Sequence, residues 1–214
     1  MSLVEIFDLV TTASNFAAIV PGIIAIFAFN RLSRTQRYLA ILVWGAALVG
    51  LCGSFFSHIL QRPNLWLIPF YVILNFVMFT LIFRHYINQR LIPYLIAGFV
   101  ISGLTYGIVT DFFAFYEPLR IVEAGSILIY CFQYFRKTLR QLDKEDIIQD
   151  PMFWISSGAL IYYSASFLFF ITIGLFIEPT ELDSLIWAAH ASLAIILYCI
   201  FFVIALLKRP TTSG

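Results

Sequence analysis

SLIWAAHASLAIILYCIFFVIALL, residues 184–207, contains no aspartate, glutamate, lysine or arginine. As an α-helix this stretch would rise about 36 Å, at about 1.5 Å per residue. The hydrocarbon core of a bilayer is about 30 Å thick, so such a helix is long enough to cross it. Lys208 and Arg209 follow immediately. The stretch therefore predicts a membrane-spanning helix that ends at a basic boundary.

Six further apolar runs precede this segment, and the gaps between them are short. Each run reaches the minimum of about 17 residues that a transmembrane helix needs. The runs lack the alternation of barrel strands and are about twice as long, so we interpret them as helices. The expected spans are 9–29, 38–57, 66–83, 91–109, 118–135, 152–176 and 184–207. We expect an all-α polytopic membrane protein, in which residues 1–214 form a single seven-helix transmembrane domain.

The composition supports a membrane class for the whole chain. Of the 214 residues, 61% are hydrophobic and 12% are charged, whereas typical soluble domains have about 25% charged residues. Seven spans leave residues for loops only, so a soluble monomer and a separate aqueous domain are excluded. The net charge of +1, without a long basic block, also argues against nucleic acid as a partner.

Basic residues are distributed unequally between the two sides of the expected bundle. One side would carry Arg31, Arg34, Arg37, Arg84, Arg90, Arg136, Lys137, Arg140, Lys144, Lys208 and Arg209. The other side would carry only Arg62 and Arg120. The positive-inside rule then places the N-terminus outside and the C-terminus in the cytoplasm. This arrangement needs an odd number of spans, which supports seven.

Small residues recur one helical turn apart in two of the expected spans. Ala46, Gly50 and Ser54 form one stripe, and Gly103 with Gly107 forms another. Such spacing lets helix backbones approach closely in lipid. Two interpretations remain open: close packing within one bundle, or the seam of a homodimer.

Strongly polar residues inside the spans are few, and each is a candidate functional residue because burying it in lipid is costly. They concentrate in the half of the bundle assigned to the outer side. This distribution predicts an outward-facing polar cavity that binds a small molecule or a lipid, as sites between bundle helices do. The expected ligand-binding residues are Asn15, Asn75, Glu123, Tyr162, Ser166 and His190.

Glu123 is the most informative of these residues, because a carboxylate in lipid takes up a proton or finds a partner. Arg120 lies one turn earlier, so we expect an ion pair, which serves either the cavity or the outer interface. His190 is either a packing residue or a pH-sensing or proton-relay residue. A zinc site that also uses His58 is disfavoured, because no two of these ligands share a helix at ligand spacing. We expect no bound metal.

The stretch from Arg136 to Asp150 is the only sizeable polar segment. It begins basic and ends acidic, with apolar residues at roughly helical spacing, so it predicts an amphipathic helix that extends the fifth span. This helix is either a solvated end or a docking surface for a cytoplasmic partner. The expected docking residues are Arg136, Lys137, Arg140 and Lys144.

The chemistries of several known seven-span proteins do not fit these residues. A retinal protein needs a lysine in the last span, but Lys137, Lys144 and Lys208 all lie at the basic side. Hydrolases of the ceramidase and progestin-receptor type need a histidine pair in the last span, which here has only His190. No GxSxG, HExxH or phosphate-binding glycine loop occurs. We therefore expect neither an enzyme nor a cofactor.

A motif in the sixth and seventh spans resembles a signature of small seven-span proteins from Bacteroidetes-type bacteria. In chain order it comprises DPMFW at 150–154, Ser157, Gly158, LIYYS at 160–164, Trp187 and His190. The resemblance covers the whole length and implies a bacterial inner-membrane protein that works beside separately encoded sensor histidine kinases. Those proteins often have an acidic residue in the third span, where Asn75 stands here.

Three functions remain open at this point. In the favoured one, the chain is a receptor-like sensor whose outer cavity binds a ligand and whose cytoplasmic side signals to a separate partner. In the second, it is a small transporter or proton-coupled carrier that uses Glu123 and His190. In the third, it is a non-catalytic membrane scaffold subunit, and the small-residue stripes form its interface.

Overall fold

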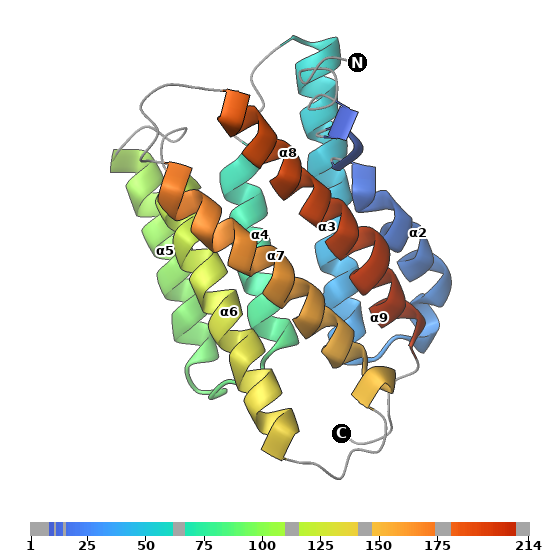
Figure 1. Ribbon diagram of the computed structural model, residues 1–214. Helices are drawn as coiled ribbons and strands as arrows, with labels where there is room; N and C mark the ends of the chain where they lie inside the picture. The colour runs from blue at the N-terminus through green and yellow to red at the C-terminus, as the bar shows by residue number, and fades with distance from the viewer. Residues whose placement is uncertain are drawn as a thin grey trace.

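The computed structural model of the chain describes residues 9–10, 12–14, 16–61, 67–109, 116–140, 147–173 and 181–208. Over these residues the regular structure is entirely helical, with no strand (Figure 1). Four helical stretches within the described part are long and apolar enough to cross a membrane: Thr12–Arg31, Arg34–Ser57, Pro151–Ile171 and Ala188–Leu207. The expectation of an all-α membrane protein is therefore confirmed.

The described helices lie within or close to the apolar runs. They are α2 (Ile19–Ala28), α3 (Arg34–Ser54), α4 (Leu67–Ile82), α5 (Ile92–Val109), α6 (Tyr116–Arg140), α7 (Pro151–Ile173), α8 (Glu181–Ile196) and α9 (Val203–Leu207). A 3-10 turn, η1 (Phe29–Arg31), extends α2, and a π-helix, η2 (Phe55–Ile59), extends α3. A second π-helix, η4 (Leu197–Phe202), joins α8 and α9 into one rod.

The polar segment 136–150 differs from the single amphipathic helix that we expected. α6 continues past the expected end of the fifth span as far as Arg140, the last residue described there, and a 3-10 turn, η3 (Ile147–Gln149), precedes α7. Residues 141–146 lie outside the described part. Asp150 begins the next helix instead of ending α6, because its Oδ1 accepts a hydrogen bond from the Met152 amide at 2.9 Å, as an N-cap residue does.

The helices form a ring with one helix outside it. α3 packs against α4, α4 against α6, and α6 most extensively against α7. The rod of α8, η4 and α9 lies along α7, and α9 packs against α2, which contacts α3 and so closes the ring. α5 stands at the edge of the bundle and packs mainly against α4 (Figure 1).

Large aromatic side chains fill the interior of the ring. Phe79, Phe83, Phe202 and Tyr134 are each no more than 1% exposed. Many apolar side chains on the outside are uncovered instead, and Phe27, for example, is 87% exposed. Water would disfavour such a surface, whereas lipid chains solvate it. The burial pattern thus agrees with the membrane class.

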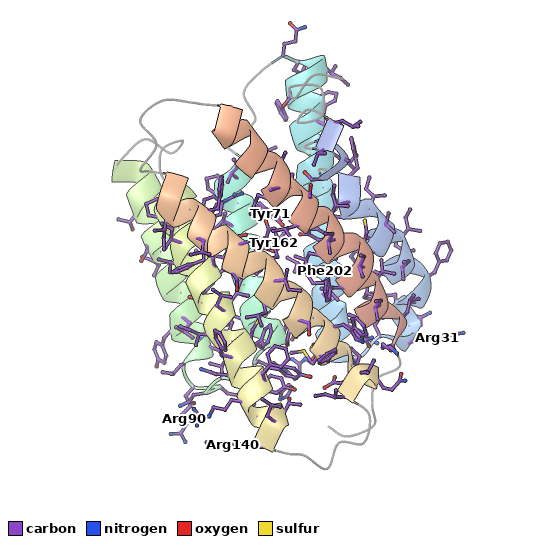
Figure 2. The ribbon with its side chains drawn as sticks, in the orientation of Figure 1. Arg31, Tyr71, Arg90, Arg140, Tyr162 and Phe202 are labelled. Atoms are coloured by element: carbon purple, nitrogen blue, oxygen red, sulfur yellow. The ribbon has the colours of Figure 1, made fainter. Side chains whose placement is uncertain are left out.

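One end of the bundle, which we call the basic end, carries Arg31, Arg90 and Arg140 (Figure 2). Gln36 connects α3 to the end of α9 there by hydrogen bonds. Its side chain is fully buried, and its Nε2 donates hydrogen bonds to the carbonyl oxygens of Ala205 at 2.8 Å and Lys208 at 2.9 Å. These carbonyls belong to the last turn of a helix, where backbone acceptors lack helical partners.

Two glycines outside the predicted stripes lie at close helix contacts. A Cβ placed on Gly158 of α7 would lie 2.6 Å from Cβ of Phe201 and 2.8 Å from Cδ1 of Leu197, both on η4. A Cβ on Gly45 of α3 would overlap Leu74 of α4. Glycine at these positions lets the helices approach closely inside the bundle.

Candidate functional site

A small polar cavity lies inside the ring, between α4, α6 and α7. Its lining residues are Tyr71, Val72, Asn75, Arg120, Glu123, Ala124, Tyr162, Tyr163, Ser166 and Phe170. The free space among them is about what one water molecule needs. Figure 2 shows two of the lining residues, Tyr71 and Tyr162, farther from the basic end than Phe202.

Glu123 is the carboxylate of this cavity, and it is 4% exposed. The Tyr163 hydroxyl donates to Glu123 Oε1 at 3.5 Å, and Asn75 Nδ2 donates to the Tyr163 hydroxyl at 2.8 Å. The three residues come from α6, α7 and α4, so one hydrogen-bonded relay connects three helices.

The inward position of Glu123 follows from the pattern of α6. Ile127, Tyr130 and Tyr134 are buried with it, at intervals of four, three and four residues, which place side chains on one face of a helix. The apolar face of α6 thus carries a single carboxylate into the interior. This placement is costly in an apolar interior unless hydrogen bonds or a proton compensate the charge.

Arg120 lines the same cavity as Glu123. Its guanidinium carbon lies 4.9 Å from the centre of the Phe170 ring, a distance at which a cation is attracted to an aromatic face. Its positive charge also acts on Glu123. The structure therefore brings both members of the expected ion pair to one site, while their direct pairing stays a prediction.

His190 approaches the cavity from α8 and is 9% exposed. Its Nε2 lies 3.1 Å from the Tyr162 hydroxyl, and its ring stacks on Phe169 with the centroids 5.3 Å apart. His190 thus finds its hydrogen-bond partner on another helix, in a tyrosine of α7. Ser166, also predicted as a ligand residue, donates its hydroxyl to the carbonyl of Tyr162 at 2.8 Å.

Sequence reasoning missed the contact between Tyr71 and Tyr198. Their hydroxyl oxygens are 2.6 Å apart, which joins the cavity to the π-helix η4. Buried tyrosine hydroxyls usually find a hydrogen-bond partner, and the position of Tyr198 within the last apolar run was a usable signal. π-helical turns are also frequent at functional sites.

An apolar layer separates the cavity from the basic end. On α4, α6 and η4, a polar residue is followed one turn later, toward the basic end, by an apolar residue that is no more than 1% exposed. The pairs are Asn75 with Phe79, Glu123 with Ile127, and Tyr198 with Phe202. The Phe79 ring packs edge-on against Tyr163 at 5.4 Å and lies 6.4 Å from the Phe202 ring. We call Phe79, Ile127 and Phe202 the apolar layer.

The three predicted docking residues that the structure describes lie on the surface at the basic end. Arg136, Lys137 and Arg140 are exposed on the last turns of α6. Lys137 Nζ donates to the His85 carbonyl oxygen at 3.4 Å and lies 5.2 Å from the centre of the Tyr86 ring. Burial, followed by the charges of Arg84, Lys137 and Arg34, lowers the pKa of His85.

Several predicted positions lie outside what the structure describes. They are Asn15, Lys144 and the side chain of His58. Among the described residues, no group of three histidine, cysteine, aspartate or glutamate side chains could hold a metal ion. The three cysteines, Cys52, Cys131 and Cys199, are free thiols.

No protein-family model, curated protein or solved structure matches the chain. The likeness to small seven-span bacterial proteins therefore stays a prediction, and the functional argument depends on the geometry of the cavity.

Proposed function

We propose that the chain is a receptor-like sensor of a bacterial inner membrane, with seven spans, an outer N-terminus and a cytoplasmic basic end. The four helices that are apolar and long enough to span support this proposal. Two shorter apolar helices, Leu67–Ile82 and Ile92–Thr105, together with α6, would complete the count. The placement of Arg31, Arg90 and Arg140 at one end supports the orientation (Figure 2).

The observation that carries the proposal is a polar cavity closed by the apolar layer toward the basic end. A sensor needs access from one side only, whereas a carrier must open its site to both sides in turn. Phe79 and Phe202 are no more than 1% exposed, so the layer is closed in this conformation. The proposed role is non-catalytic.

A continuous rod could carry the signal from the cavity to the cytoplasm. α8 brings His190 and η4 brings Tyr198 to the polar cluster, and α9 ends at the Gln36 hydrogen bonds. Lys208 Nζ donates to Gln149 Oε1 at 3.0 Å, which links the same end to the turn before α7. A shift of the rod would therefore move the basic end, where the exposed docking residues lie.

A proton-coupled carrier is the second candidate, because Glu123 is a buried carboxylate within a hydrogen-bonded relay. Such groups mark ion and proton pathways in membrane proteins. In this candidate the apolar layer would have to open during each cycle. The third candidate, a scaffold subunit, would bind its partner at all times, and changes in the cavity would not affect that binding.

One pair of measurements distinguishes these candidates. A photo-crosslinking amino acid at Arg140, in cells, reports a partner at the basic end, and Ile101, 62% exposed on α5, is the matched control position. Proton flux into liposomes reports transport by the purified protein.

A sensor gives a partner crosslinked only from position 140, with a yield that changes in Glu123→Gln, and no flux. Flux that disappears in Glu123→Gln would replace the sensor by the carrier. A partner captured at the same yield in both proteins would favour the scaffold.

A further inference from the structure

The size of the cavity limits what it binds in this conformation. Pockets for small organic ligands enclose about 300–1,000 Å³. The space beside Glu123 is about what one water molecule needs. A metabolite or a lipid headgroup does not fit, so the candidates are a proton, a water molecule or a monatomic ion.

The charges around the cavity favour the proton. Arg120 lines the cavity and would repel a metal cation. The carboxylate of Glu123, placed in the same space, would repel an anion. A proton is the one cation that Glu123 can take up covalently, and its uptake removes a negative charge from an apolar interior.

An unpartnered acceptor points to the same ligand. Asn75 is 4% exposed, and its Oδ1 has no hydrogen-bond partner among the described residues. In the relay as it stands, Asn75 donates to Tyr163, and Tyr163 donates to the carboxylate. Both hydrogen bonds run toward Glu123, the direction in which an ionised carboxylate accepts them.

Protonation can reverse this relay without moving a helix. A protonated Glu123 becomes a donor to the Tyr163 hydroxyl, which must then turn its own proton elsewhere. If the Asn75 amide rotates by half a turn, Oδ1 faces Tyr163 and accepts that proton. The buried oxygen that lacks a partner in one state is thus satisfied in the other.

We propose that the ligand of this cavity is a proton, which binds to the Glu123 carboxylate and reverses the hydrogen bonds of Tyr163 and Asn75. The inference rests on the proposed sensor function and names its stimulus as acidity on the outer side.

The other polar groups that face Glu123 belong to three elements, and groups from two further elements stand behind them. Arg120 of α6 and Tyr162 of α7 line the cavity, as does Tyr71 of α4. Behind them, Tyr198 of η4 contacts Tyr71, and His190 of α8 contacts Tyr162. A proton on Glu123 changes the field at both contacts, which lie on the proposed signalling rod.

Infrared spectroscopy of the protein in lipid nanodiscs tests the proposal, because a protonated carboxyl has its own carbonyl stretching band. The titration runs from about pH 4 to about pH 9, which brackets ordinary and raised carboxyl pKa values. The expected result is a band that grows toward acid pH and is absent in Glu123→Gln. Asp150→Asn, a change at another buried carboxylate, should keep that band.

Tyr163→Phe provides a second variant that leaves the carboxyl in place. Without its hydroxyl partner, the band should move to higher frequency and still titrate. The proposal is overturned if no titrating band depends on Glu123, or if a metal cation or an organic molecule binds in a manner that depends on Glu123. A titrating band without any change in partner crosslinking would leave the proton site standing and refute the sensor.

Discussion

Substituting Gly158 by alanine should separate α7 from η4. The added Cβ would meet Cβ and Cγ of Phe201 at 2.6 Å and Cδ1 of Leu197 at 2.8 Å. Because the Phe201 atoms lie next to the backbone, they have little freedom to move aside. Overpacking of this kind lowers the free energy of unfolding by about 1–3 kcal/mol, and a clash with Cβ is expected at the upper end, about 3 kcal/mol. Alanine recovers about 1 kcal/mol of helix propensity, so the net loss is about 2 kcal/mol.

Gly98→Ala on α5 is the matched control, because a Cβ at this position meets nothing within 4 Å. It should raise stability by about 0.5–1 kcal/mol, through helix propensity alone. Thermal unfolding in detergent, followed by circular dichroism, measures both variants. A loss of about 2 kcal/mol corresponds to a midpoint lower by about 4–8 °C. If Gly158→Ala proved as stable as Gly98→Ala, the close approach of α7 and η4 would be refuted.

Three further predictions concern the contacts around the cavity and at the basic end. Gln36→Leu leaves two carbonyl oxygens at the end of α9 without their donor, at a cost of about 1–3 kcal/mol. Amide hydrogen exchange should accelerate at the end of α9 and stay unchanged in α5, and equal acceleration in both helices would contradict the role of the Gln36 hydrogen bonds. Tyr198→Phe and Tyr71→Phe each remove the 2.6 Å contact, so a double-mutant cycle should give a coupling of about 1 kcal/mol, whereas additive losses would show that the hydroxyls do not interact. Lys137→Met should raise the pKa of His85, which is lowered chiefly by burial and further by nearby positive charges, Lys137 among them. Nuclear magnetic resonance measures this pKa, and a decrease in the variant would contradict the placement of Lys137.

Much of the helical layout could be predicted from hydropathy alone. The expected run 66–83 corresponds to α4, Leu67–Ile82, and the run 91–109 to α5, Ile92–Val109. Uninterrupted apolar segments favour helices in lipid whatever their neighbours are, so these positions need no tertiary information. The ends of α6 were harder, because polar residues continue the helix to Arg140, where the hydropathy signal has already stopped.

The members of the polar cluster were accessible to sequence reasoning, but their partners were not. Asn75, Glu123, Tyr162 and His190 stood out as polar groups in apolar runs, and the structure gathers all four around one site. Tyr163 was harder to select, because its neighbour Tyr162 has the same chemistry. Which of two adjacent tyrosines meets Glu123 depends on the rotation of α7 against α6, and pairwise helix packing sets that rotation.

The contact between Tyr71 and Tyr198 shows a second limit. A regular α-helix from residue 184 would fix the direction of Tyr198, but the π-turn of η4 rotates the residues that follow it. Nothing in the apolar run marks where such a turn falls. The sequence therefore predicted a polar interior without the link between the cavity and the rod of α8, η4 and α9.

The most direct test of the sensor account is a distance measurement at the basic end in response to acid. Spin labels at Arg31 and Arg140, both exposed there (Figure 2), report the distance between the end of η1 and the end of α6, once the native cysteines are replaced. Double electron–electron resonance is recorded in nanodiscs at acid and at neutral pH, for the parent protein and for Glu123→Gln. The account predicts a distance distribution that shifts with pH in the parent and stays fixed in Glu123→Gln. A distribution that ignores pH, or that shifts equally in both proteins, would contradict it.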